Sequence, residues 1–572
     1  MNRKCVSWAL CVVAGLFAVA PSAVAQHALP ADTAQQVNIT VNLDKPLGTY
    51  KPIYAWFGYD EANFTTMHDG RALMKELHDL SPVPVTIRAH HLLTSGNGVP
   101  ELKWSSTGVY SEDAQGKPVY NFTLLDGIFD AYRDAGVRPM VELGFMPKDL
   151  AADVPGRPEA YQVHYPASTI SGRSNNPPKD YVKWGELCRT VTEHLVQRYG
   201  RDTVQQWYFE VWNEPDIDYW HGTPQDYFKL YDYAVAGVRA ALPNAIVGGP
   251  ATTGPRSDKA YAFLKGFLDH VRDDRSAADG KVIPLQFISF HAKGQPVIQN
   301  GEVTMGIRSE LRDVDRGFSL IASYPQFKPL PIILSEADPE GCAACSSKVN
   351  PANNYRNGTL YPAYTAAAYK RLFDLADKHG VNLISMLSWS FEFENRDSFE
   401  GFRDLSTNGV DKPILNFFRM AAKMNGTRVT ATSSAEVALD KALADGVRGN
   451  SDIAAMATRD SHSAATMLWN YNDAAASTTT ASVQLTIAQL SSAVHAVRVT
   501  EYRIDSMHSN AYTVWQQLGS PAHPTPDQLR KLKSVDGLQS MGPPHRVTVK
   551  NAKLTMAVAL PAQSVSLFLF DW

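Results

Sequence analysis

Strand-like and helix-like patterns alternate through eight rounds between residues 46 and 425. Each round begins with a short apolar run and continues with an amphipathic segment, which stops at a glycine in rounds such as those ending at Gly136, Gly200 and Gly380. Helices that connect parallel strands cover both faces of a sheet, and eight such units close it into a barrel. We therefore predict the α/β class, with a (β/α)8 TIM barrel over residues 46–425. The expected strands are residues 53–59, 83–90, 137–143, 207–212, 245–249, 285–291, 332–336 and 382–389.

The pattern changes after Asn425 to short runs in which apolar and polar residues alternate. Such runs are typical of an antiparallel β-sandwich, which we expect over residues 426–572. A further alternating run, residues 37–43, precedes the barrel. We expect residues 26–45 to supply an N-terminal strand that joins the sandwich.

The N-terminus has the features of a targeting segment. Arg3 and Lys4 precede an apolar run over residues 6–20, and small residues occupy positions 23 and 25. This arrangement predicts a signal peptide over residues 1–25, cleaved after Ala25. The apolar run is too short to cross a bilayer comfortably. We expect a periplasmic or secreted protein of bacterial type.

Composition and cysteine content narrow the range of partners. Charged residues make up 20% of the chain and the net charge is −4, so neither nucleic acid nor a membrane surface is favoured as a partner. Cys342 and Cys345 could form a disulfide in an oxidising compartment, whereas one such pair offers too few ligands for zinc. We expect no metal and no organic cofactor, and the sequence does not indicate an oligomeric state.

Two predicted strands end in glutamate. The strand that begins at Trp207 ends on Asn213-Glu214-Pro215, and the strand at residues 331–334 is followed by Ser335-Glu336. The carboxyl ends of barrel strands meet at one rim, so these side chains are expected to face each other. A pair of carboxylates is the usual machinery of glycoside hydrolysis. We predict that Glu214 is the acid/base and Glu336 the nucleophile, the alternative being that both are structural.

The same residues carry a family resemblance. The run from Phe209 to Asp216, Phe-Glu-Val-Trp-Asn-Glu-Pro-Asp, together with the later Glu336, resembles glycoside hydrolase family 39, which contains β-xylosidases and α-L-iduronidase. This family belongs to the clan of (β/α)8 retaining glycosidases. The resemblance implies a double displacement on an oligosaccharide substrate, with two glutamates as the reacting groups.

The resemblance also implies substrate-binding roles around the pair. Arg88, at the end of the second strand, would stabilise the ionised nucleophile, and Asn213 would contact the sugar 2-hydroxyl. His90 and His291 match residues that contact the glycone, or are histidines of the pocket wall. Phe145 and Trp389 would pack on the apolar face of the sugar.

The choice of sugar depends on two further positions. His291-Ala-Lys293-Gly resembles the iduronidase branch, in which the lysine binds the sugar carboxylate. Glu392, after the eighth strand, is a candidate partner for ring hydroxyls, as glutamates are in the xylosidases. Because the expected bacterial export favours breakdown of plant polysaccharide, we predict an exo-acting β-D-xylosidase with a possible α-L-arabinofuranosidase side activity. The alternatives are an α-L-iduronidase-like uronide hydrolase and, from another class, a non-catalytic carbohydrate-binding protein.

Overall fold

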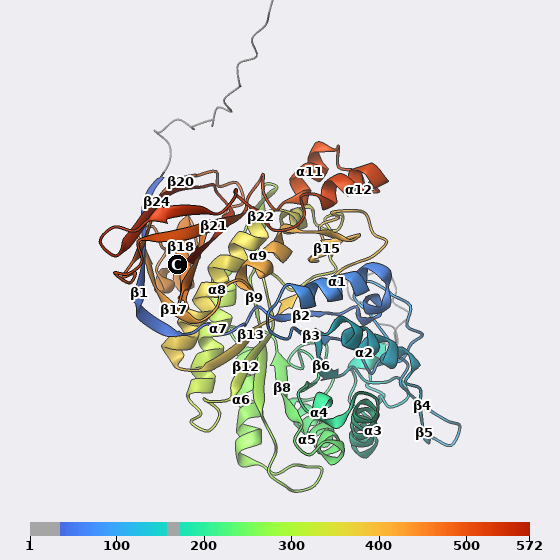
Figure 1. Cartoon of the computed structure of the whole chain (residues 1–572). Coiled ribbons are helices and arrows are strands. Elements are labelled where there is room, and N and C mark those ends of the chain that lie inside the picture. Colours follow the sequence, from blue (N-terminus) through green and yellow to red (C-terminus); the bar gives the residue numbers. More distant parts are fainter. Residues whose placement is uncertain (1–34, 157–171) are drawn as a thin grey trace, which may run out of the picture.

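The computed structural model describes residues 35–156 and 172–572. The predicted signal peptide lies outside the described residues. Eight parallel strand positions form a ring, and helices surround it (Figure 1). The strands are β2 (Trp56–Tyr59), β3 (Thr86–Ala89), β6 (Arg138–Leu143), β7 (Tyr208–Val211), β8 (Ile246–Thr252), β9 (Phe287–Lys293), β12 (Pro331–Asp338), β13 (Asn382–Met386) and β14 (Ser388–Trp389).

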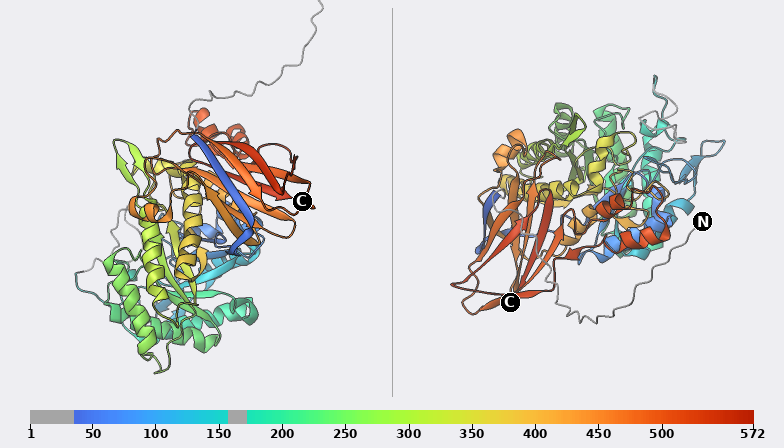
Figure 2. Two further views of the ribbon diagram at one scale, coloured as in Figure 1. Left: turned by 90° about the vertical axis from the view of Figure 1, so that its left-hand side faces the viewer. Right: turned by 90° about the horizontal axis from the view of Figure 1, so that it is seen from above.

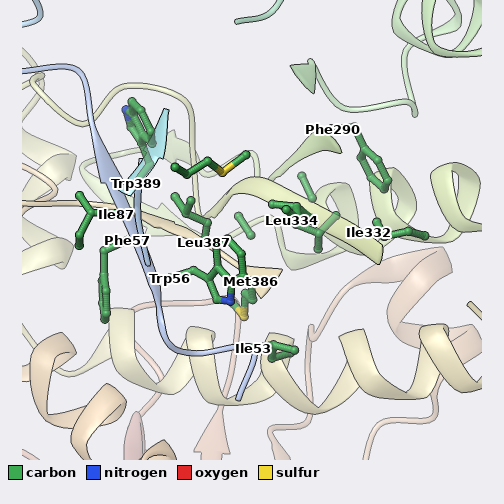
Figure 3. Close-up of a cluster of buried hydrophobic side chains, with 14 of the residues drawn as sticks. Ile53, Trp56, Phe57, Ile87, Phe290, Ile332, Leu334, Met386, Leu387 and Trp389 are labelled. Carbon is green, nitrogen blue, oxygen red and sulfur yellow. The ribbon is translucent and has the colours of Figure 1, made fainter. Parts of the chain in front are cut away.

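The ring closes through the last two of these strands. β14 continues β13 after Leu387, and Ser388 pairs with Phe57 of β2, so both pieces occupy the eighth position. All neighbouring pairs around the ring are parallel. Figure 3 shows part of the buried core, in which Trp56, Leu334 and Met386 come from three of the strand positions. The predicted TIM barrel is confirmed.

Local signals fix several of the surrounding helices. The side chain of Asp180 caps α3 by accepting from the backbone N–H groups of Val182 and Lys183. α5 begins with a capping box between Thr223 and Asp226. The helices of the barrel are α1 (His68–Asp79), α2 (Thr123–Ala135), α3 (Tyr181–Tyr199), α4 (Arg201–Val204), α5 (Pro224–Ala241), α6 (Asp258–Asp273), α7 (Ile307–Ala322), α8 (Leu360–His379) and α9 (Pro413–Ala421). The loops contain short 3-10 helices, which are η1 (Ala62–Thr66), η2 (Gly172–Asn175) and η3 (Pro351–Asn357). They also contain three hairpins, which are β4–β5 (Tyr110–Glu112, Pro118–Tyr120), β10–β11 (Val297–Gln299, Glu302–Thr304) and β15–β16 (Ser406–Thr407, Val410–Asp411).

The C-terminal domain is one curled sheet. Its strands run in the order β22-β21-β25-β19-β18-β17-β1-β20-β24, with β23 also paired to β21. β1 is antiparallel to β17 but parallel to β20, so the sheet is mixed rather than purely antiparallel as expected. Its strands are β1 (Gln35–Thr49), β17 (Thr427–Ser433), β18 (Asp452–Arg459), β19 (Ser463–Tyr471), β20 (Ala481–Ala488), β21 (Ala496–Ile504), β22 (Gln539–Ser540), β23 (His545–Thr548), β24 (Lys553–Leu560) and β25 (Ser564–Asp571), and its helices are α10 (Leu439–Asp445), α11 (Ala511–Gln517) and α12 (Pro526–Lys533).

Alternation along the strands separates two cores. In β18, Ile453 and Ala455 face the interior of the sandwich, whereas Ala454 and Met456 belong to the core shared with the barrel. The sheet therefore buries one face against itself and, at its centre, the other face against α8 (Figure 1). A buried ion pair of 2.9 Å between Arg371 of α8 and Asp452 ties the two parts together. Both turned views show the sheet against one side of the barrel (Figure 2).

The C-terminal helices cover part of the loop that follows β14. The Phe399 ring lies 5.2 Å from the Trp515 ring of α11, and the Ser398 N–H donates to the Ala522 carbonyl. Cys342 and Cys345 form a disulfide in the loop after β12. Among residues 35–156 and 172–572, no helix has both the length and the apolar character that crossing a membrane requires.

Candidate active site

Polar side chains gather where the barrel strands end. Strand register places Glu336 of β12 level with His291 of β9, and Asp338 level with Lys293. On the opposite wall, the chain turns sharply after β7: Trp212 and Glu214 both adopt positive φ, of 71° and 44°. Non-glycine residues rarely adopt this conformation, which costs roughly 1–3 kcal/mol at each position. The turn is held by backbone hydrogen bonds from Trp212 to Leu143 and from Glu214 to Ala251.

The two predicted catalytic carboxylates meet. One oxygen of Glu214, one oxygen of Glu336 and a ring nitrogen of His291 all lie within 4.8 Å of one another. His291 Nδ1 is 2.8 Å from Glu214 Oε1 and 3.7 Å from Glu336 Oε1. The Glu214 side chain is 15% exposed and that of Glu336 6%, so both can reach a bound ligand. Two carboxyl groups about 5–5.5 Å apart are the spacing at which one acts as acid/base and the other as nucleophile.

Cationic groups surround the Glu336 carboxylate. Lys293 Nζ lies 2.8 Å from Oε2, and Arg88 and His90 approach Oε1 at 3.4 and 3.6 Å. Burial alone would raise the pKa of Glu336, but the nearby charges of His291 and Lys293 and the hydrogen bond from His90 hold it well below its usual range. Glu336 is therefore ionised at neutral pH, as a nucleophile must be.

Arg88 organises the base of the site. Its fully buried guanidinium contacts Glu210 at 2.5 Å and Glu142 at 2.8 Å, and donates to Asn213 Oδ1 at 3.0 Å. Because a guanidinium only donates, this bond turns the amide oxygen of Asn213 toward Arg88, and its NH₂ group is the end that can face a sugar. Glu210 thus has the cationic partner that a charge deep in the barrel requires.

His90 is also held by carboxylates. Its Nδ1 lies 2.6 Å from Glu142, and its Nε2 lies 3.3 Å from Asp60. Burial lowers the pKa of His90, but the charge and hydrogen bond of Glu142 outweigh this and raise it to about 9. His90 is therefore cationic at neutral pH. Asp60 was not among the predicted site residues, although it directly follows β2 and the strand-end rule that identified Glu214 applies to it equally.

The predicted aromatic residues form the wall behind His90. The Trp389 ring lies 4.3 Å from the His90 ring and under the Arg88 guanidinium, at 5.0 Å. Phe145 packs edge-on against His90 at 5.7 Å. Both aromatic side chains are almost fully buried, which places them next to the site as packing partners of His90. Their contact with the sugar stays a prediction.

The groups that act on Glu392 do not include the carboxylate pair. The chain leaves the rim after Trp389, where the Leu405 N–H donates to the Phe391 carbonyl and draws the segment toward the β15–β16 hairpin. Among the described residues, the groups that act on Glu392 include Ser406 and Asp404, and burial raises its pKa to about 8. The expected contact with ring hydroxyls therefore finds no support in this geometry.

Asp338 takes the position beside Lys293. Its Oδ2 lies 2.6 Å from Lys293 Nζ, while its Oδ1 accepts from the Trp389 N–H at 3.0 Å. Lys293 is thus shared between two carboxylates, those of Glu336 and Asp338.

Glu214, His291 and Glu336 are also close enough to hold a metal ion. Glu336, however, is already paired with Lys293 and faces the cationic side chains of His90 and Arg88. These positive charges would repel a metal cation. This donor set fits a metal poorly, and the absence of a metal stays a prediction.

Comparison with known proteins places the chain in a family of glycosidases. A family model described as glycosyl hydrolases family 39 matches residues 99–548. The chain is 27% identical over 468 residues to a β-xylosidase of Geobacillus stearothermophilus, covering 78% of this chain and 79% of that protein. It is 24% identical over 473 residues to the α-L-iduronidase of Mus musculus, covering 78% and 68%. The crystal structure of a monomeric β-xylosidase from Caulobacter crescentus CB15 matches with a TM-score of 0.71 at 22% identity, over 93% of this chain and 99% of that chain, which shows the shared fold. Because the family model spans more than half of the 572 residues, the chain belongs to glycosyl hydrolases family 39 and is a glycosidase.

Proposed function

We propose that this glycosidase is an exo-acting retaining β-D-xylosidase that releases xylose from the non-reducing ends of xylo-oligosaccharides. The observation that carries the proposal is the approach of Glu214 and Glu336 from opposite walls, with oxygens within 4.8 Å. The β-xylosidase relatives support the choice of sugar. An α-L-arabinofuranoside side activity is included in the proposal.

The geometry supports a double displacement. The Glu336 carboxylate attacks the anomeric carbon while the bond to the leaving oxygen breaks, and Glu214 gives its proton to that oxygen. A glycosyl ester on Glu336 results. Glu214, now a carboxylate, removes a proton from water, which attacks the anomeric carbon and frees Glu336. His291, 2.8 Å from Glu214, holds the acid in place between these steps.

The environment of Lys293 favours a neutral sugar. Its ammonium contacts Glu336 at 2.8 Å and Asp338 at 2.6 Å, so its charge is already compensated. A uronate would have to draw this ammonium from two buried carboxylates, at a cost in free energy. A xylose, which has no charged substituent, avoids that cost.

A uronide hydrolase of the α-L-iduronidase kind is the second candidate. It is favoured by the presence of Lys293 itself at the rim and by the iduronidase relatives. A non-catalytic carbohydrate-binding protein is disfavoured, because binding alone does not need an ionised carboxylate beside a second acid.

The test is a panel of nitrophenyl glycosides of xylose, arabinofuranose and iduronic acid. We expect the xyloside to be hydrolysed with the highest kcat/KM, and activity to be lost in Glu336→Ala and partly restored by azide. A preference for the iduronide would support the second candidate. No turnover of any glycoside would favour the binding protein. We also propose export through residues 1–25, which N-terminal sequencing of the mature protein would test.

A further inference from the structure

A cleft of about 1150 Å³ opens directly beside the acid/base. Glu214 and Lys293 form its inner end, and it continues between the start of α6 and the outer side of α7. Ser257 and Tyr261 line one wall of the cleft, and Ser319 of α7 lines the other. The cleft therefore leads from the catalytic pair to the outside of the barrel.

Basic residues dominate the lining of this cleft. Five of the lining side chains are lysine or arginine, against three carboxylates, and one of these three is Glu214, which must carry a proton to act as the acid. The cations are Arg256, Lys293, Arg312, Arg316 and Lys378. Lys293 is already paired with Glu336 and Asp338, so the charge that the cleft offers to a ligand depends on the other four cations.

Several of these cations have acidic partners. Arg256 pairs with Asp313, and Lys378 pairs with Asp315 at 3.0 Å. Arg316 reaches Asp258, whose side chain is 94% exposed and is therefore well screened by water.

Arg312 differs from the others. Its Nε and NH2 groups donate to the carbonyls of Leu443 and Ala444, at the end of α10, and it makes no ion pair with any carboxylate in the described part of the chain. These two carbonyls fix the guanidinium in place but do not cancel its charge. Arg312 is exposed, so the remaining donors face the solvent of the cleft.

The position of the cleft identifies which part of a substrate enters it. A general acid lies next to the oxygen of the leaving group, because it must protonate that oxygen as the bond breaks. Glu214 belongs to the lining of the cleft, whereas the nucleophile Glu336 and its neighbours Arg88 and His90 do not. The cleft is therefore on the leaving-group side of the site.

We propose that this cleft binds the leaving-group portion of an acidic oligosaccharide, one whose sugars beyond the cleaved bond carry uronic acid carboxylates. The inference rests on the proposed function and extends it: the terminal sugar is neutral, and the chain from which it is released is anionic. Arginine suits this role because its planar donors match a carboxylate.

The test compares two trisaccharides of β-1,4-linked xylose. One is unsubstituted, and the other carries a glucuronic acid on the xylose at the reducing end, so that the terminal xylose is the same in both. The measured quantity is the ratio of kcat/KM for the acidic trisaccharide to that for the neutral one. We expect the wild-type ratio to exceed one and to fall as ionic strength rises, since salt screens exposed charges.

Arg312→Gln should lower this ratio about two- to fivefold, the range that single exposed charges give. Arg308→Gln is the matched control: Arg308 lies one turn earlier on α7 and also donates to the Ala444 carbonyl, but it does not line the cleft. The control should leave the ratio unchanged and should hydrolyse a neutral nitrophenyl xyloside like the wild type. An equal ratio in wild type and Arg312→Gln, or an equal decrease in both variants, would overturn the proposal.

Failure of the xylosidase assignment gives a different result. If neither trisaccharide is cleaved, their binding to the wild type and to Arg312→Gln, measured by calorimetry, still tests the cleft. Tighter binding of the acidic trisaccharide that is lost in Arg312→Gln would support it. Equal binding of the two trisaccharides by the wild type would refute it.

Discussion

Replacing Arg88 with methionine is the sharpest test of the charge network beneath the active site. The substitution keeps an unbranched apolar stem and removes a guanidinium that contacts Glu210 at 2.5 Å, Glu142 at 2.8 Å and Glu336 at 3.4 Å. In this variant Glu142 would still have His90 as an ion-pair partner, and Glu336 would still have Lys293. Glu210 would lose its ion-pair partner, and its other oxygen already has no hydrogen-bond partner among the described groups.

The loss of these contacts sets the expected cost of Arg88→Met in folding free energy. Removing one member of a buried ion pair destabilises a protein by roughly 3–5 kcal/mol. At about 2 °C per kcal/mol for a large domain, the melting temperature should fall by about 6–10 °C. Turnover of a nitrophenyl xyloside should also fall about 100-fold, because Asn213 loses the donor that orients its amide.

Thermal unfolding of a set of variants measures this effect. Adding Glu210→Gln to Arg88→Met removes the unpaired charge, so the double variant should recover about 1–3 kcal/mol of the loss. Arg138→Met, at the start of β6, is the control, because Arg138 makes no ion pair with the described residues and should change stability by less than about 0.5 kcal/mol. If Arg88→Met costs no more than this control, the ion pairs of Arg88 do not stabilise the fold.

Three further predictions follow from the site. Glu214→Gln should lower kcat/KM by about 10²–10⁴-fold on xylobiose, whose leaving group needs an acid, but far less on a dinitrophenyl xyloside; equal losses would remove the acid role. Lys293 helps to hold the pKa of Glu336 low, so Lys293→Met should raise that pKa. The nucleophile would then be protonated at higher pH, and the acidic limb of the kcat/KM profile should move to higher pH. An unmoved limb would contradict the assignment. Replacing Cys342 and Cys345 with serine should cost about 2 kcal/mol or less, measured by thermal unfolding, because the disulfide closes a very short loop.

The barrel and the approach of Glu214 to Glu336 could be predicted because their signals are local. Each strand is an apolar run followed by a helical pattern, and a polar residue at the end of such a run stands out, as Glu214 and Glu336 do. Asp60 also follows a strand, but it was not predicted, because a single acid at a strand end does not indicate a site until its partner, His90, is known.

Other features depend on contacts that the sequence does not encode locally. β18 lacks the alternation that predicts a strand, because its run Ile453-Ala-Ala-Met456 is buried on both faces, by the sandwich and by the core shared with the barrel. The parallel pairing of β1 with β20 joins segments more than 400 residues apart. The turn of the chain toward the β15–β16 hairpin includes the hydrogen bond from the Leu405 N–H to the Phe391 carbonyl, which the residues directly after Trp389 do not indicate.

The ends of several elements also differ from the predicted ones. β9 was expected to stop at His291 but continues to Lys293, which places Lys293 in register with Asp338. The pairing of these two side chains, and with it the argument for a neutral sugar, could be derived only from the structure.

Trapping the glycosyl-enzyme intermediate tests the central claim most directly. The enzyme is incubated with a 2-deoxy-2-fluoro-xyloside that has a good leaving group, and the digested protein is analysed by mass spectrometry. If Glu336 attacks the sugar while Glu214 serves as the acid, one fluoroxylosyl group should be attached to the peptide that contains Glu336, through that carboxylate. Attachment to another residue, or an inverted product with no attachment, would contradict the account.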